Sequence, residues 1–79
     1  MMIRADEVAA RLRDEGITDK AIEFALQRGR EAGNIVLDEK DGTLITHAEI
    51  ENLTLWVRYR EVGADVEIVD AYYHRMQVV

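Results

Sequence analysis

The chain has 79 residues, enough for one folded domain and too few for two. It has no cysteine and only two histidines, which excludes disulfides and a structural zinc site of the usual Cys/His kind. Its net charge of −6, carried mostly after residue 33, disfavours nucleic acid and anionic membranes as partners, because both attract positive surfaces.

No apolar run approaches the roughly 18–20 residues of a membrane span. The first residues also lack the apolar segment of a secretory signal. With 48% hydrophobic and 33% charged residues, the composition is typical of a globular protein. We therefore expect residues 1–79 to form a single acidic domain located in the cytoplasm, without a membrane partner.

The first third of the chain predicts two helices joined by a short turn. The first ends at Gly16, and the second runs from a cap at Thr18 or Asp19 to Gly33. Apolar residues recur on one face of each helix, at Ala5, Val8, Ala9 and Leu12 and at Ile22, Ala25, Leu26 and Gly29. Such a short joint predicts an αα-hairpin.

After Gly33 the apolar pattern changes to that of strands. Residues 35–37 predict a short strand, and a turn of three or four residues ending near Gly42 sets Leu37 opposite Leu44 or Ile45. Residues 46–49 match a capping box, which predicts one helical turn around His47 to Asn52, with a continued strand as the alternative.

The strongest strand pattern is a long hairpin, residues 53–60 and 66–76, around a two-residue turn at Gly63-Ala64. This register sets Arg60 opposite Glu67 and Tyr59 opposite Ile68. The predicted apolar face, which would meet the helices, comprises Leu53, Leu55, Val57, Tyr59, Val66, Ile68, Tyr72 and Met76, with Asp70 and His74 among them. The fold class is therefore α+β, an N-terminal αα-hairpin on one face of an antiparallel β-meander of three to four strands.

The other face of the hairpin is the predicted interaction surface. Aromatic and arginine side chains dominate the binding energy of protein interfaces. The residues predicted for this surface are Trp56, Arg58, Arg60, Tyr73 and Arg75. The alternative is an ordinary solvated sheet face, on which the arginine stems shelter the tryptophan.

Asp70 and His74 form a possible polar site, because a carboxylate on an apolar face needs a partner. One interpretation is an acid with a raised pKa near a histidine. The other is a structural carboxylate that binds a tyrosine or an arginine. The spacing of His47 and His74 indicates no metal site, and no cofactor motif is present. There is no serine or cysteine nucleophile, so no catalytic residue is predicted.

The sequence thus predicts a non-enzymatic interaction or accessory module that binds a protein partner or a second copy, as a possible homodimer. One alternative is a winged-helix-like DNA-binding domain, because a short helix–helix joint precedes a hairpin, although the second helix shows no basic surplus. The other alternative is a small enzyme that would use Asp70 and His74.

Overall fold

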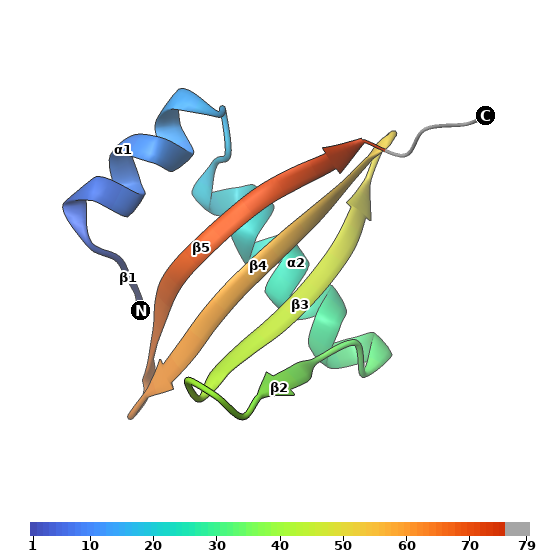
Figure 1. Cartoon of the computed structure of the whole chain (residues 1–79). Helices are drawn as coiled ribbons and strands as arrows, with labels where there is room; N and C mark the ends of the chain where they lie inside the picture. Colours follow the sequence, from blue (N-terminus) through green and yellow to red (C-terminus); the bar gives the residue numbers. More distant parts are fainter. Residues whose placement is uncertain (76–79) are drawn as a thin grey trace.

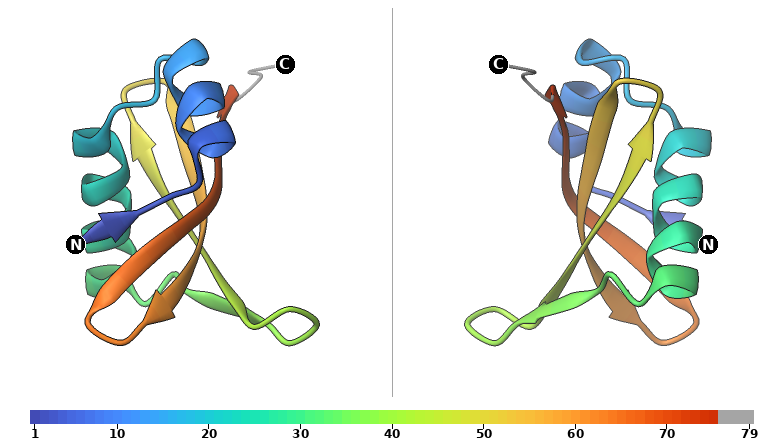
Figure 2. Two further views of the ribbon diagram at one scale, coloured as in Figure 1. Left: turned by 90° about the vertical axis from the view of Figure 1, so that its left-hand side faces the viewer. Right: turned by 90° about the vertical axis from the view of Figure 1, so that its right-hand side faces the viewer.

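The structure, a computed structural model, describes residues 1–75, with Arg75 described by its backbone alone. Two helices, α1 (Asp6–Asp14) and α2 (Asp19–Ala32), cover one face of a five-stranded sheet (Figures 1 and 2). In the order β1-β5-β4-β3-β2, the strands are Met2–Ile3, Asp65–Arg75, Leu53–Val62, Thr43–Ile50 and Val36–Asp38. The α+β class and the packing of the helical pair on the sheet are confirmed.

The predicted strand number of three to four is wrong, and the sheet is mixed rather than antiparallel. The additional strand, β1, lies parallel to β5, with Met2 opposite Val66. A strand of two residues is too short to show an alternating pattern, so the sequence contains no signal for it.

The predicted helix ends are confirmed. Gly16 has a φ of +73° after the last turn of α1, and Gly33 adopts the left-handed conformation at the end of α2. Thr18 caps α2, because its Oγ1 accepts a hydrogen bond of 3.2 Å from the backbone N–H of Ala21.

The first hairpin, β2–β3, has the predicted pairing of Leu37 with Leu44. The helical turn predicted around His47 to Asn52 is wrong, and the alternative of a continued strand is confirmed. Even-numbered residues of β3, among them the buried Thr46, point toward the helices and hold this segment in the sheet. A two-residue turn then leads into β4, with Glu51 at a φ of +57°.

The second hairpin, β4–β5, follows the predicted register near its turn. Arg60 lies opposite Glu67, and Tyr59 lies opposite Ile68. Beyond this point the register shifts, because Arg58 lies opposite Asp70 and Val69 is an extra residue in β5. The shift is a β-bulge.

The bulge reverses the predicted faces of the end of β5. Ala71 is fully buried and Tyr73 packs against the core, whereas Tyr72 and His74 are exposed and Asp70 is half-exposed. The prediction that Tyr73 points outward, and that Asp70, Tyr72 and His74 point toward the helices, is therefore wrong. The prediction for Met76 lies outside the described residues.

The core lies between the helices and the inner face of the sheet. The helices contribute Leu12, Ile22, Ala25 and Leu26, together with Ile17 between them, and the central strands contribute Ala48, Leu55, Val57, Tyr59, Ile68 and Ala71. At one point α2 lies directly against β3, where Gly29 faces Thr46.

Candidate functional site

The candidate site lies on the sheet face turned away from the helices, which we call the outer face. Along β4, the buried residues Leu55, Val57 and Tyr59 alternate with the partly exposed Trp56, Arg58 and Arg60. Because successive side chains of a strand point to opposite faces, these last three residues lie on the outer face, as predicted.

Three side chains form a row across the middle of the outer face, which we call the aromatic row: His47, Trp56 and Tyr72. They are directly opposite one another on β3, β4 and β5. The rings of His47 and Trp56 stack with their centroids 4.6 Å apart. Tyr72 is 48% exposed. The row therefore presents an aromatic surface on three adjacent strands of the sheet.

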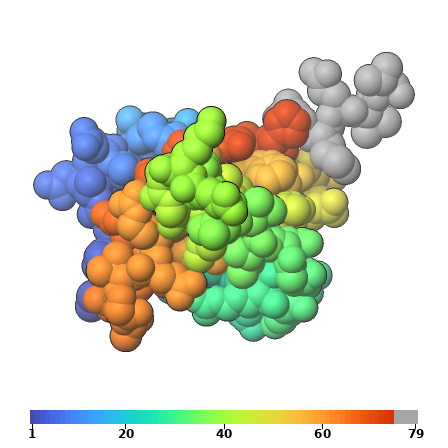
Figure 3. Space-filling view, turned by 60° about the horizontal axis from the view of Figure 1, so that its bottom comes forward, coloured from blue at the N-terminus to red at the C-terminus, as the bar shows by residue number. Residues whose placement is uncertain are grey.

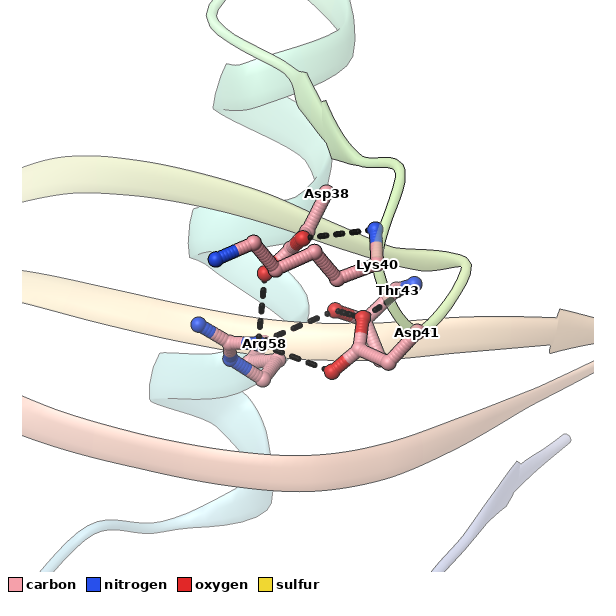
Figure 4. A network of polar contacts seen from close by, with 5 residues as sticks. All are labelled: Asp38, Lys40, Asp41, Thr43 and Arg58. Carbon is pink, nitrogen blue, oxygen red and sulfur yellow. Dashed lines mark hydrogen bonds and ion pairs between the residues drawn. The ribbon is translucent and has the colours of Figure 1, made fainter.

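Arg58 is bound to the loop of the first hairpin (Figure 4). Its Nη1 donates to Asp38 Oδ2 at 3.2 Å, to Asp41 Oδ2 at 3.1 Å and to Thr43 Oγ1 at 3.2 Å. The loop bends toward the outer face, away from the helices (Figure 2), where its carboxylates reach the guanidinium group. The charge of Arg58 is therefore balanced within the chain.

Thr43 also lowers the pKa of Asp41 from 3.8. Asp41 Oδ1 accepts two hydrogen bonds from Thr43, one from its hydroxyl at 2.6 Å and one from its backbone N–H at 3.0 Å. Both favour the carboxylate, and the positive charge of Arg58 adds to the effect.

We therefore expect Asp41 to titrate below pH 3.8 in the folded chain, as measured by NMR of its carboxyl carbon. A lowered folded-state pKa contributes stability that is present above the unfolded-state pKa and is lost as the pH falls through the folded-state value. Removing the hydroxyl donor in Thr43→Val should raise the midpoint toward 3.8. Thr54→Val, outside this network, should leave the midpoint unchanged, and a midpoint near 3.8 in the unmodified chain would contradict the assignment.

Arg60, the second arginine predicted for the interaction surface, also has a partner within the chain. Its Nη1 lies 3.1 Å from Glu67 Oε1 on the neighbouring strand. Both arginines follow Trp56 along β4, and each forms ion pairs within the chain. The outer face thus combines an aromatic row with paired charges.

The last two residues predicted for the interaction surface do not join it. Tyr73 lies on the inner face, for the reason given above. The backbone of Arg75 ends β5 opposite Leu53, and its side chain lies outside the described part of the structure. Of the five predicted residues, the structure brings together Trp56, Arg58 and Arg60.

The possible polar site at Asp70 and His74 loses its premise, because neither residue lies on the apolar face. Asp70 forms an ion pair with Arg11 of α1 and accepts a hydrogen bond from the N–H of Ala71 at 2.8 Å. Arg11 also donates to the carbonyl oxygen of Ala71 at 3.1 Å. Asp70 thus joins α1 to β5. It has the role of the second interpretation, a structural carboxylate that binds an arginine.

His47 and Tyr72 were not predicted as members of the outer face. A signal for His47 was present: a two-residue turn at Glu51-Asn52 pairs Ile50 with Leu53, which places His47 opposite Trp56. Tyr72 had no such signal, because its side depends on the bulge at Val69.

A cleft of about 200 Å³ lies between the end of α2 and the middle of β3, lined by Arg28, Ala32, Asn34, His47, Ala48 and Glu49. Within the described part of the chain, His, Asp and Glu side chains form no group of three that could hold a metal ion. No helix in that part is long and apolar enough to cross a bilayer.

The comparisons with known proteins do not indicate a function, so the proposal below rests on the geometry of the outer face. No protein-family model, curated protein sequence or solved structure matches the chain.

Proposed function

We propose that the chain is a non-enzymatic interaction module that binds another protein, either a larger one or a second copy, through its outer face. The observation that carries the proposal is the aromatic row on the sheet face that the helices leave uncovered. Tryptophan and tyrosine give large contact areas at low entropic cost, and buried aromatic anchors dominate binding energies.

The charges around the aromatic row favour a protein partner. A platform for single-stranded nucleic acid combines stacking rings with guanidinium or ammonium groups that reach the phosphates. Here the guanidinium groups of Arg58 and Arg60 are bound to Asp38, Asp41 and Glu67 of the same chain. A partner that covers the row would meet an aromatic centre with a polar rim, the usual composition of a protein interface.

The proposal predicts that truncating the centre of the row weakens binding to the partner. The tagged chain would be used to capture partners from an extract of its source cells, and each captured protein would then be titrated in purified form. Trp56→Ala should lower the affinity by roughly tenfold or more, which corresponds to a loss of about 1.4 kcal/mol or more for an interface hot spot. Tyr72→Ala should act in the same direction.

Phe24 provides the matched control. It is a large aromatic residue on α2 that is 44% exposed, but it belongs to the helical layer rather than to the outer face. Phe24→Ala should leave binding unchanged. Equal binding by the unmodified chain, Trp56→Ala and Tyr72→Ala, together with self-association that neither variant alters, would contradict the proposal.

A further inference from the structure

The two edges of the sheet differ in how they are covered. At the β5 edge, β1 pairs with Val66 and Glu67, and Arg11 of α1 binds the carbonyl oxygen of Ala71. At the other edge, β2 pairs with β3 on one side only, and in the sheet order nothing described lies beyond it. Figure 3 shows this hairpin (yellow-green) at the surface of the molecule. An uncovered strand presents unpaired backbone N–H and C=O groups to solvent.

The side chains at this edge are apolar and exposed. Val36 is 64% exposed and Leu37 is 55% exposed, among the highest values of any large hydrophobic residue in the described chain. They point to opposite faces of the sheet, so that both faces of β2 are apolar. Natural edge strands commonly are very short or carry lysine, proline or an inward-pointing charge that prevents pairing. In β2, which has three residues, Val36 and Leu37 are apolar and the third residue is Asp38.

The one charge in β2 does not oppose the approach of a second copy. Asp38 Oδ2 binds Arg58, and its Oδ1 accepts a hydrogen bond of 3.1 Å from the backbone N–H of Lys40. The charge of Asp38 is therefore paired within its own chain, although Arg58 also pairs with Asp41 and the whole chain carries a charge of −6. The repulsion between the net negative charges of two copies acts over a longer distance than the contacts of β2, and salt screens it.

We propose that two copies of the chain associate by antiparallel pairing of their β2 strands, with Val36 of each copy opposite Val36 of the other. A two-fold axis perpendicular to the sheet keeps the outer faces of both copies on the same side. It also sets Leu37 opposite Ile35, and Asp38 opposite the amide side chain of Asn34. A register centred on Leu37 would instead place Asp38 opposite Val36, and so lose an apolar pair.

The symmetry closes the assembly at two copies. Each β2 edge is used once, because the two-fold axis pairs the two β2 strands with each other. At the β5 edge, β1 pairs with Val66 and Glu67, and Arg11 binds the carbonyl oxygen of Ala71. The dimer joins the β2 edges and does not cover the aromatic row of the proposed function. The two proposals can therefore fail independently.

Because the chain has no cysteine, single cysteine variants test the register directly. Residues directly opposite on antiparallel strands have their Cα atoms about 4.5–5.5 Å apart, within the range that a disulfide bridges. Val36→Cys should therefore form a covalent dimer under mild oxidation. Leu37→Cys should not, because the two Leu37 Cα atoms would be roughly 8 Å apart.

Val62→Cys is the control, since Val62 is a 47% exposed valine at the β4–β5 turn. Cross-linking of Leu37→Cys in place of Val36→Cys would overturn the Val36-centred register. Equal cross-linking of Val36→Cys and Val62→Cys would overturn the proposal as a whole, because it would reflect random collision.

Light scattering and sedimentation velocity supply the non-covalent test. A small interface predicts a dimer that forms between about 10 µM and about 1 mM, more readily at higher salt. Val36→Lys should be monomeric over this range, and Val62→Lys and Trp56→Ala should remain dimeric. A monomer at the highest concentration in the unmodified chain would overturn the proposal. A dimer lost in Trp56→Ala but retained in Val36→Lys would place self-association on the outer face instead.

Discussion

Replacing Gly29 by alanine is expected to destabilise the fold by about 2 kcal/mol or more, the cost of overpacking a closely packed contact. In an exposed helix the same change would stabilise by about 1 kcal/mol. The sign reverses here because α2 lies directly on β3. A methyl group at position 29 would overlap Thr46 Oγ1 and lie 2.9 Å from Thr46 Cβ. For a chain of this length, a loss of 2 kcal/mol lowers the Tm by roughly 8–16 °C.

A double-mutant cycle with Thr46→Ala identifies the contact responsible. Thr46 Oγ1 is buried and has no hydrogen-bond partner among the described residues, so its removal sacrifices no hydrogen bond. Thermal unfolding should show Gly29→Ala to be less costly in the Thr46→Ala background than alone. Glu31→Ala, at an exposed position of α2, serves as the control and should change the Tm little. If the losses of stability caused by Gly29→Ala and Thr46→Ala simply add in the double variant, the contact between the two residues is not the cause of the destabilisation.

Deleting Ala71 is expected to be the most damaging single-residue change in β5. If the bulge disappears, Asp70 moves opposite Val57 on the inner face, where a buried carboxylate costs several kcal/mol. If the bulge remains, Tyr72 must enter the space of Ala71, which is fully buried. Both outcomes predict that the free energy of unfolding falls by about 3 kcal/mol or more, a large share of the total for a small domain. Urea unfolding measures this change.

Deleting the neighbouring Val69 is expected to be tolerated, with a cost of about 1 kcal/mol or less. Val69 is the extra residue of the bulge. Without it, Ile68 still lies opposite Tyr59 and Asp70 still lies opposite Arg58, so every other side chain keeps its face. A similar loss of stability on deleting either residue would contradict the described register.

The same bulge explains why the sequence predicted only part of the candidate site. Strict alternation from the turn at Gly63 is correct as far as Ile68, and beyond the bulge it assigns the wrong face to residues 70–74. The side chains themselves allow a register with or without the bulge. Tyr72 would lie on the inner face without the bulge, and Tyr73 lies there with it. Asp70 and His74 on the predicted apolar face were signs of an error, and they were interpreted as a possible polar site. Propensity does not locate a bulge, because the bulge depends on packing across the sheet.

Elements governed by local chemistry were predicted well. The caps at Gly16, Thr18 and Gly33 depend on residues within one helical turn, and the two-residue turn at Gly63 depends on its own backbone conformation. The capping-box pattern at residues 46–49 failed because tertiary packing opposed it. Thr46 and Ala48 are buried beneath α2, and this burial holds them in a strand. The strand β1 depends entirely on a partner more than 60 residues away.

The pairing of β1 with β5 has a consequence for how the chain folds as it leaves the ribosome. The strand β1, Met2–Ile3, finds its partner only when Val66 and Glu67 emerge. The helix that follows it likewise lies against β5, through Arg11 and Ala71. Closing so long a loop is slow compared with forming local contacts. We therefore expect α2 and the β3–β4 hairpin to form the early nucleus, and β1 and α1 to dock last, after Val66 and Glu67 have been translated.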